Sequence, residues 1–311
     1  MIPSRSLLLT GVADVWAALR GEARGGGERL GLGLMVVAAA SFALMAAFAK
    51  KLLPETPTQA VVLSRGVIMS SLFVALAWRN RVPLIGHEPR MLLGRGLLGY
   101  GALSCYFWSV QHLSLGDAVL LQYSHPIFVA AIAPLLLGEP TRRSDLALVL
   151  VALLGVGLIV RPAGSVRPEA LVGVMGSVLS GLAYIAVRRL SRTEHPLTIL
   201  VWFPLATVPG SLVASIAAGR ASLPRDGREV AGHLLVTATA LVGQVTLTYG
   251  LARVGAARAT AVTLSGPVFG LLFGWLFFGA LPSAASLGGT AIVLGSLALL
   301  GWTSLRRRDP G

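Results

Sequence analysis

A run of polar residues interrupts one of the most apolar stretches of the chain. Residues 116–138 read GDAVLLQYSHPIFVAAIAPLLLG, with the polar run QYSHP at 122–126. At about 1.5 Å per residue, a helix of this length crosses a bilayer, and an ionisable side chain inside a membrane usually belongs to a functional site. Gln122 and His125 lie three residues apart and therefore share one helical face. The pattern predicts a polar face that can bind the amino and carboxylate groups of a small solute.

The same arrangement recurs 141 residues later, in residues 257–279, ARATAVTLSGPVFGLLFGWLFFG. Superposing the two stretches pairs serine with serine and proline with proline, and sets a glycine opposite the histidine (Ser124/Ser265, Pro126/Pro267 and His125/Gly266). A proline in a membrane helix frees a carbonyl and permits bending, so we predict hinges at Pro126 and Pro267. The alternative to a solute-binding polar face is that Ser124 and Gln122 bond back to the backbone that Pro126 frees.

The offset also pairs one face of residues 91–112 with one face of residues 230–251. Together with the two interrupted stretches, these faces predict the lining of a cavity between two halves of the chain. The candidate substrate-binding residues are Tyr100, Phe107, Gln122, His125, Tyr184, Gln244, Thr248 and Thr263. Thr and Gln also form ordinary interhelical hydrogen bonds, and aromatic rings also simply pack, so a structural role stays open for each of them.

Arg65 is a charge eight residues into an apolar stretch, 57–78. It could attract a substrate carboxylate, make a structural bond, or extend its side chain to the membrane surface. No Asp or Glu stands in the middle of an apolar stretch, so proton or sodium coupling through a carboxylate has no candidate residue. We expect a facilitator, or a weakly coupled carrier whose central titratable group is His125.

Composition and motifs exclude several classes of protein. Charged residues make up 13% of the chain and apolar residues 55%, with a mean hydropathy of +0.76, whereas soluble domains carry about 25% charged residues. The net charge of +13 comes from arginines at the ends of apolar runs, which indicates membrane topology rather than nucleic-acid binding. The run GRGLLG at 94–99 follows no strand, and no metal-ligand spacing occurs. We expect no enzyme, no cofactor and no metal; a membrane-embedded enzyme or a scaffold is the less favoured alternative.

Ten apolar stretches of membrane-spanning length follow one another with short connections. They cover residues 31–53, 57–78, 91–112, 116–137, 144–161, 169–188, 197–218, 230–251, 256–278 and 284–303. With the N-terminus in the cytoplasm, 18 of the 26 Lys and Arg lie on the cytoplasmic side and 7 on the other, with Arg65 inside a span. Because cytoplasmic loops are enriched in Lys and Arg, we predict that both termini are cytoplasmic.

The two halves of the chain repeat each other, with five spans each. FAKKL at 48–52 ends the first span and AVRRL at 186–190 ends the sixth, and a proline opens the next span in both cases. Because five is an odd number, the copies insert in opposite senses, which is typical of transporters with a substrate site near the bilayer midplane. We predict an all-α membrane protein of ten transmembrane helices, arranged as two inverted five-helix repeats (31–161 and 168–303).

The ends of the chain and its small-residue pairs add two further expectations. Residues 1–30 form a cytoplasmic segment that is either an interfacial amphipathic helix or a disordered leader, and residues 304–311 form a basic cytoplasmic tail. Gly270-xxx-Gly274 and Ser177-xxx-Gly181 indicate close helix contacts within the bundle or between protomers. We therefore expect a monomer or a weak homodimer in the lipid bilayer.

These features resemble the drug/metabolite transporter superfamily with its duplicated EamA-type domain. The resemblance rests on the ten spans, the cytoplasmic termini, the duplication, and the pattern Ala118–Pro126–Gly138-Glu139-Pro140; Ala280 replaces the acid in the second copy. The aromatic third span and the QYSHP run are similar to those of the aromatic amino acid exporters of the bacterial inner membrane.

The resemblance implies an inner-membrane exporter of amino acids, including aromatic ones, that works by alternating access around a central cavity. The alternatives are export of another metabolite or drug, such as a nucleotide precursor, a vitamin, or amino acids like threonine and homoserine.

Overall fold

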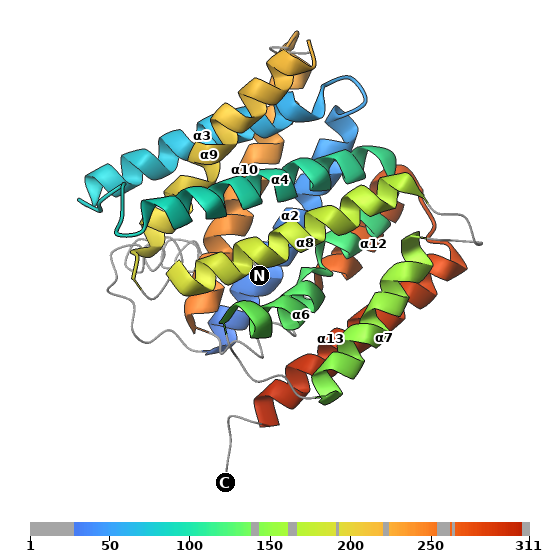
Figure 1. Cartoon of the computed structure of the whole chain (residues 1–311). Helices are drawn as coiled ribbons and strands as arrows, with labels where there is room; N and C mark the ends of the chain where they lie inside the picture. Colours follow the sequence, from blue (N-terminus) through green and yellow to red (C-terminus); the bar gives the residue numbers. More distant parts are fainter. Residues whose placement is uncertain are drawn as a thin grey trace, which may run out of the picture.

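The computed structural model describes residues 28–137, 143–160, 167–190, 193–219, 224–253, 262 and 265–306. The first half of the chain forms α2 (Glu28–Leu52), α3 (Thr58–Arg79), α4 (Pro89–His112), α5 (Leu115–Gln122), α6 (His125–Leu137) and α7 (Arg143–Val160). The second half forms α8 (Pro168–Leu190), α9 (Pro196–Ala217), α10 (Gly227–Arg253), α12 (Ser265–Phe278) and α13 (Ala284–Arg306) (Figure 1). No strand occurs in these residues, which confirms the all-helical class.

Each of the ten predicted spans overlaps a helix, and the fourth span is divided between α5 and α6. By length and composition, α2, α3, α8, α9 and α10 contain five segments that can each cross a membrane. The predicted N-terminal segment lies outside the described residues up to residue 27, as does most of the basic tail. Glu139 of the family pattern also lies outside them.

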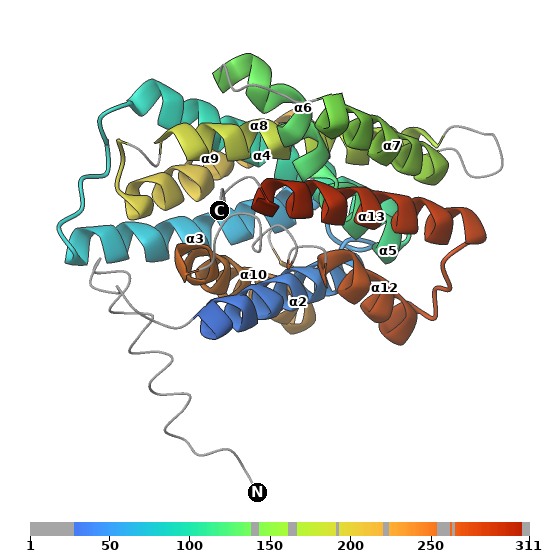
Figure 2. The same cartoon turned by 90° about the horizontal axis from the view of Figure 1, so that it is seen from below.

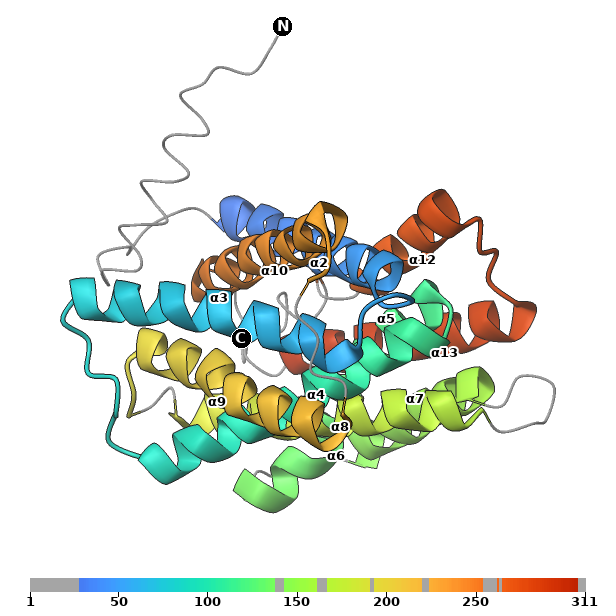
Figure 3. The same ribbon diagram turned by 90° about the horizontal axis from the view of Figure 1, so that it is seen from above.

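The main helix contacts each join one helix of the first half to one helix of the second. α2 packs on α10, α4 on α8, α3 on α9, α7 on α13, and α5 on α12. Figures 2 and 3 show α2 with α10 along one side of the molecule and α4 with α8 along the opposite side, while α3 with α9 and α7 with α13 occupy the two ends. The two halves are therefore interleaved, and the largest hydrophobic cluster contains residues of both.

Small residues allow the closest of these contacts. A Cβ on Gly96 of α4 would lie 2.7 Å from the Trp202 carbonyl oxygen of α9, and a Cβ on Gly270 of α12 would lie 2.7 Å from the Val119 Cβ of α5. Gly181 of α8 also lies close to α6, where its Cβ would be 3.3 Å from the His125 carbonyl oxygen. The predicted small-residue contacts therefore occur within the bundle, where backbones approach closely.

Lys50 shows that the basic end of the first span also has a structural role. Its Nζ donates to the carbonyl oxygens of Val110 and Leu113 at 2.9 and 2.6 Å. These carbonyls belong to the end of α4, where the last turn of a helix leaves acceptors unpaired and carries partial negative charge. The ammonium group thus caps α4 from a neighbouring helix.

Candidate functional site between the two halves

The break in the fourth predicted span lies between α5 and α6, just before Pro126. Pro126 has no N–H for the Gln122 carbonyl four residues earlier, and Nδ1–H of His125 donates to that oxygen instead, at 2.9 Å. The Ser124 hydroxyl donates to the carbonyl four residues before it, also at 2.9 Å. His125 therefore holds the break in place through Nδ1, and only its Nε2 can reach a solute.

The second copy begins its helix in a related way. Pro267 is the third residue of α12, and the Ser265 hydroxyl donates to the Val262 carbonyl at 2.7 Å. Residues 254–261 and 263–264 lie outside the described residues, so the predicted site residue Thr263 has no described position. In both copies, the serine two residues before the proline donates its hydroxyl to a backbone carbonyl.

Four side chains meet across the two halves at this break, and we call them the interhalf cluster: Gln122, His125, Ser180 and Tyr184. Gln122 Nε2 donates to Ser180 Oγ at 2.8 Å, and the His125 ring stacks on the Tyr184 ring with centroids 4.5 Å apart. Gln122 Oε1 is buried and has no hydrogen-bond partner among the described residues. The cluster unites three of the predicted site residues, Gln122, His125 and Tyr184.

Tyr184 is exposed over 45% of its surface. The stacked His125 ring is itself buried, so the tyrosine presents the accessible aromatic surface of the pair. A flat solute could stack offset or edge-on against such a ring.

Tyr123, beside the cluster, explains why glycine stands opposite His125 in the repeat. A Cβ on Gly266 would lie 2.6 Å from Cε2 of the Tyr123 ring, much closer than carbon atoms pack. The first copy thus places its tyrosine ring directly on the backbone of the second copy. A side chain at Gly266 would displace that ring.

The other predicted lining residues take separate positions. The Tyr100 hydroxyl donates to Gln59 Oε1 at 3.2 Å, and its ring covers Gly210 of α9. Phe107 is 0% exposed and belongs to the main hydrophobic core. Gln244 lies half-buried on α10, and the side chain of Thr248 lies outside the described residues. Of these, the structure shows a packing role for Phe107.

Two arginines from the first half lie against one aromatic ring of the second half. The guanidinium carbons of Arg65 on α3 and Arg95 on α4 are 5.7 and 4.7 Å from the ring centroid of Phe203 on α9. Arg65 is 4% exposed, so its side chain does not reach a membrane surface. For both arginines, Nε and Nη1 are buried and have no hydrogen-bond partner among the described residues.

The sequence analysis identified Arg65 as a charge inside a span, but it counted Arg95 among the cytoplasmic Lys and Arg that indicate membrane topology. The available signal was the glycine pair of GRGLLG, which brings α4 onto α9 at Gly96 and Gly99. A Cβ on Gly99 would lie 2.6 Å from Arg95 Nη1 and 2.7 Å from Phe203 Cδ2. The glycine therefore makes the space in which this guanidinium lies.

A buried histidine on α10 also escaped the sequence reasoning, which took His125 as the central titratable group. His233 is 4% exposed, its Nδ1 is 2.5 Å from Ser64 Oγ on α3, and its Nε2 is buried without a partner in the described part of the chain. Ser64 precedes Arg65 directly, so α3 carries adjacent polar contacts to both α9 and α10.

Glu194 ties the loop before α4 to the loop before α9, and we call this contact the Glu194 tie. Its Oε1 accepts the backbone N–H groups of His87 and Glu88 at 2.5 and 2.6 Å. Gly86 has φ +69°, and a Cβ there would lie 2.6 Å from Glu194 Oε2, so the turn both needs a left-handed residue and has no room for a side chain. The carboxylate thus caps the N-terminus of α4 from the other half.

A second tie lies at the opposite ends of these helices, and we call it the Asp117 tie. Asp117 at the start of α5 is 5% exposed and accepts the Ser286 hydroxyl of α13 at 2.5 Å. Arg167, just before α8, forms a salt bridge with its other oxygen at 3.4 Å. The two halves are therefore joined by buried carboxylates at both ends of the bundle.

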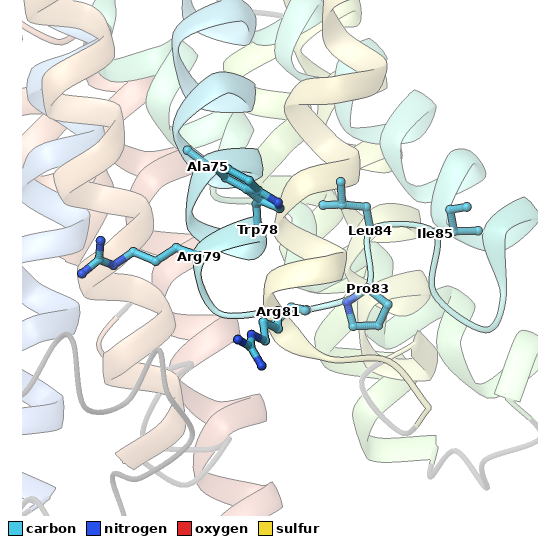
Figure 4. A pocket seen from close by; sticks show the side chains of 8 residues that line it. Ala75, Trp78, Arg79, Arg81, Pro83, Leu84 and Ile85 are labelled. Atoms are coloured by element: carbon cyan, nitrogen blue, oxygen red, sulfur yellow. The ribbon is translucent and has the colours of Figure 1, made fainter.

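A surface hollow lies away from this site. It measures about 1050 Å³ and lies at the end of α3 and the following loop, where Trp78, Arg79, Arg81, Leu84 and Ile85 border it (Figure 4). Trp78 is 82% exposed. An exposed tryptophan with nearby arginines is typical of a membrane–water interface, so we assign this hollow to the membrane boundary rather than to solute binding.

His195 lies just before α9 and outside the predicted spans. Its Nδ1 accepts the backbone N–H of Leu197 at 3.2 Å and caps the helix. Partial burial lowers the pKa of His195 below its usual range. The ring therefore stays neutral near pH 7, which the acceptor role requires. No group of His, Cys, Asp and Glu that could hold a metal ion occurs in the described part of the chain.

Comparison with known proteins gives the family. The EamA-like transporter family model matches twice, over residues 29–161 and 167–302. The chain is 32% identical to the pseudopaline exporter CntI of Pseudomonas aeruginosa over 272 residues, which cover 86% of this chain and 95% of the relative. It is 24% identical to the probable transport protein YPL264C of Saccharomyces cerevisiae, over 77% of this chain and 76% of the relative.

A riboflavin transporter of Rhizobium johnstonii is 27% identical over 71% of this chain and 73% of the relative. A solved crystal structure shares the fold with a TM-score of 0.62 at 22% identity, over 90% of this chain and 99% of that one. The predicted superfamily is thereby confirmed, whereas the narrower likeness to aromatic amino acid exporters is not among these findings. With a duplicated domain that covers nearly all of its helices, this chain belongs to the EamA-like transporter family of multi-pass membrane transporters.

Proposed function

We propose that this chain exports small amino-acid-like metabolites, including aromatic amino acids, across the bacterial inner membrane. The observation that carries the proposal is the interhalf cluster, because it places amide, imidazole and phenol groups at a helix break between the two copies. The identity to an exporter over 95% of that relative supports export as the direction. The count of Lys and Arg supports cytoplasmic termini.

The helix contacts support two inverted copies related by a pseudo-two-fold axis. In the repeat, α2 corresponds to α8, α3 to α9, α4 to α10, α6 to α12 and α7 to α13. When each helix is replaced by its counterpart, the contact of α2 with α10 becomes that of α8 with α4. In the same way, α4 with α9 becomes α10 with α3, and α12 with α2 becomes α6 with α8. The pairs α3 with α9 and α7 with α13 exchange with themselves. All of these pairs are in contact, as an inverted repeat requires.

The two ties suggest how access could alternate. The Glu194 tie joins the copies at the end predicted to face the cytoplasm, and the Asp117 tie joins them at the other end. Opening either side requires the tie on that side to break, while the interhalf cluster at the hinge prolines keeps the solute between the copies. A solute would then bind near the break between α5 and α6.

A second candidate substrate is pseudopaline, because the first of the relatives above exports it. Riboflavin is a third candidate substrate, because another of the relatives above is a riboflavin transporter. The interhalf cluster suits either an amino acid or a larger flat molecule, since it offers both hydrogen-bonding groups and an accessible ring.

The test is counterflow in liposomes that contain the purified protein. Labelled amino acids, pseudopaline and riboflavin are compared with and without a pH gradient, and we expect flux of at least one of them. His125→Ala and Ser180→Ala should each reduce this flux, while Ser71→Ala on the exposed face of α3 should not. Absence of flux for every compound would refute the proposed function.

A further inference from the structure

The strongest unexplained feature of the molecule is the pair of arginines on Phe203. An arginine inside a membrane protein normally pairs with a carboxylate or with backbone carbonyls, because an unpaired buried charge is costly. Arg65 and Arg95 each leave Nε and Nη1 buried without such a partner in the part of the chain that the structure describes. The ring of Phe203 is their shared neighbour, and it provides attraction to cations but no hydrogen-bond acceptor.

None of the buried carboxylates in the described residues pairs with these arginines. Three described carboxylates are buried, and each has its own contacts: Asp117 with Ser286 and Arg167, Glu194 with the backbone of His87 and Glu88, and Glu229 with the backbone N–H of Arg225. Two like charges that share one ring also repel each other. The arrangement is thus poor as a structural element and suited to a site that an anion completes.

The position of the pair connects it with the interhalf cluster. Arg95 lies on α4, which packs on α8, and α8 carries Tyr184, whose ring stacks on His125. Arg65 lies against Phe203 of α9, and α9 also packs on α4. The arginine pair and the interhalf cluster are therefore joined through α4, which contacts both α9 and α8.

We propose that Arg65 and Arg95 form the binding site for a carboxylate of the transported solute, with Phe203 holding both guanidinium groups in position and Tyr184 contacting the aromatic part of the solute. This inference rests on the proposed function and specifies its substrate class as organic anions or zwitterions. A guanidinium binds a carboxylate through paired N–H···O bonds in a dry site. Lipid headgroups are excluded as the ligand because Arg65 is 4% exposed.

The proposal predicts opposite effects on binding and on stability. Replacing Arg65 by Gln removes a buried charge without a protein partner, so the ligand-free protein should unfold at the same temperature or at a higher one. The same change should weaken carboxylate binding by about tenfold or more. A structural arginine would give the reverse, with lower stability and unchanged binding.

The experiment uses the purified full chain and a matched pair of probes, 3-phenylpropionate and its neutral amide. Binding is measured as the rise in unfolding temperature with probe concentration, for wild type, Arg65→Gln, Arg95→Gln and the charge-conserving Arg65→Lys. The control is Arg79→Gln, which removes an exposed charge from the same helix. We expect wild type to bind the acid more tightly than the amide, both glutamine variants to lose this preference, and the lysine variant and the control to retain it.

Several outcomes would overturn the site. If the acid binds no better than the amide in wild type, or if both glutamine variants keep the preference, the arginines do not bind carboxylates. The liposome assay separates failure of the carboxylate site from failure of the proposed function. If neutral and anionic compounds are transported equally well, the protein is a transporter but the arginines are not its carboxylate site. Selective binding of the acid without flux of any compound would keep the site and refute export.

Discussion

Removal of the Glu194 carboxylate should release the loop before α4 from the second copy. The two backbone N–H groups that it accepts, those of His87 and Glu88, lie at 2.5 and 2.6 Å and bond to a charged group. Hydrogen bonds of this kind contribute about 1.5–3 kcal/mol each, and two that share one oxygen do not add fully. We therefore expect Glu194→Ala to remove about 3 kcal/mol of the free energy that holds this loop against the second copy.

Hydrogen–deuterium exchange measures this directly, because the two amides report on their own acceptor. A loss of about 3 kcal/mol corresponds to roughly a hundredfold faster exchange at 1.4 kcal/mol per factor of ten. Glu194→Gln keeps an oxygen acceptor without the charge, so its effect should be about half as large in free energy. The exchange of the peptide that contains His87 and Glu88 is compared with that of a peptide from α7, which the tie does not contact.

The matched control is Glu55→Ala. Glu55 precedes the proline that opens the second span of the first copy, as Glu194 does in the second copy, but it is exposed. The control should therefore leave exchange at residues 87 and 88 unchanged. If Glu194→Ala also leaves the exchange of these amides within about threefold of wild type, the carboxylate does not hold the loop and the reasoning fails.

Three further changes test other contacts by unfolding in detergent. Gly266→Ala should destabilise by about 1–3 kcal/mol because its Cβ overlaps the Tyr123 ring; Gly288→Ala, with nothing within 4 Å, should not, and Tyr123→Ala should restore the first variant. Asp117→Ala should cost about 2–4 kcal/mol by leaving its buried partners unpaired; a loss below about 0.5 kcal/mol would contradict the tie. His195→Asn should remove a pH dependence. Because the pKa of His195 is lowered in the folded protein, the stabilisation from this cap is complete above the usual pKa of about 6.5 and is lost as pH falls below it through the lowered pKa. The loss should be about 0.5 kcal/mol for an exposed cap. Equal pH dependence of wild type and variant would exclude this role.

The helices and their duplication were predictable because both are recorded locally in the sequence. Apolar runs of membrane-spanning length define helices on their own, and the proline of the QYSHP run indicates where α5 and α6 separate. The contact between Gln122 and His125 also follows from spacing on one turn. Such inferences need no knowledge of which helix packs on which.

The partners of individual side chains were not predictable, since they depend on helices far apart in the chain. Ser64 and His233 lie 169 positions apart, and nothing in either local sequence indicates the other. Arg95 resembled a loop arginine by its place near a span end, yet the glycines of α4 bring it against Phe203. Phe107 fitted the predicted cavity face by spacing, but spacing alone does not tell which face of a helix meets the core.

The ring of Tyr123 on Gly266 bears on how a duplicated gene can diverge. A chain made of two first copies would set a histidine where the tyrosine ring now lies on bare backbone. A chain made of two second copies would lose the ring itself, because the residue that pairs with Tyr123 is Leu264. The halves have thus become complementary in shape, and we expect that swapped chimeras of this protein fail to assemble even though each half keeps its own helices.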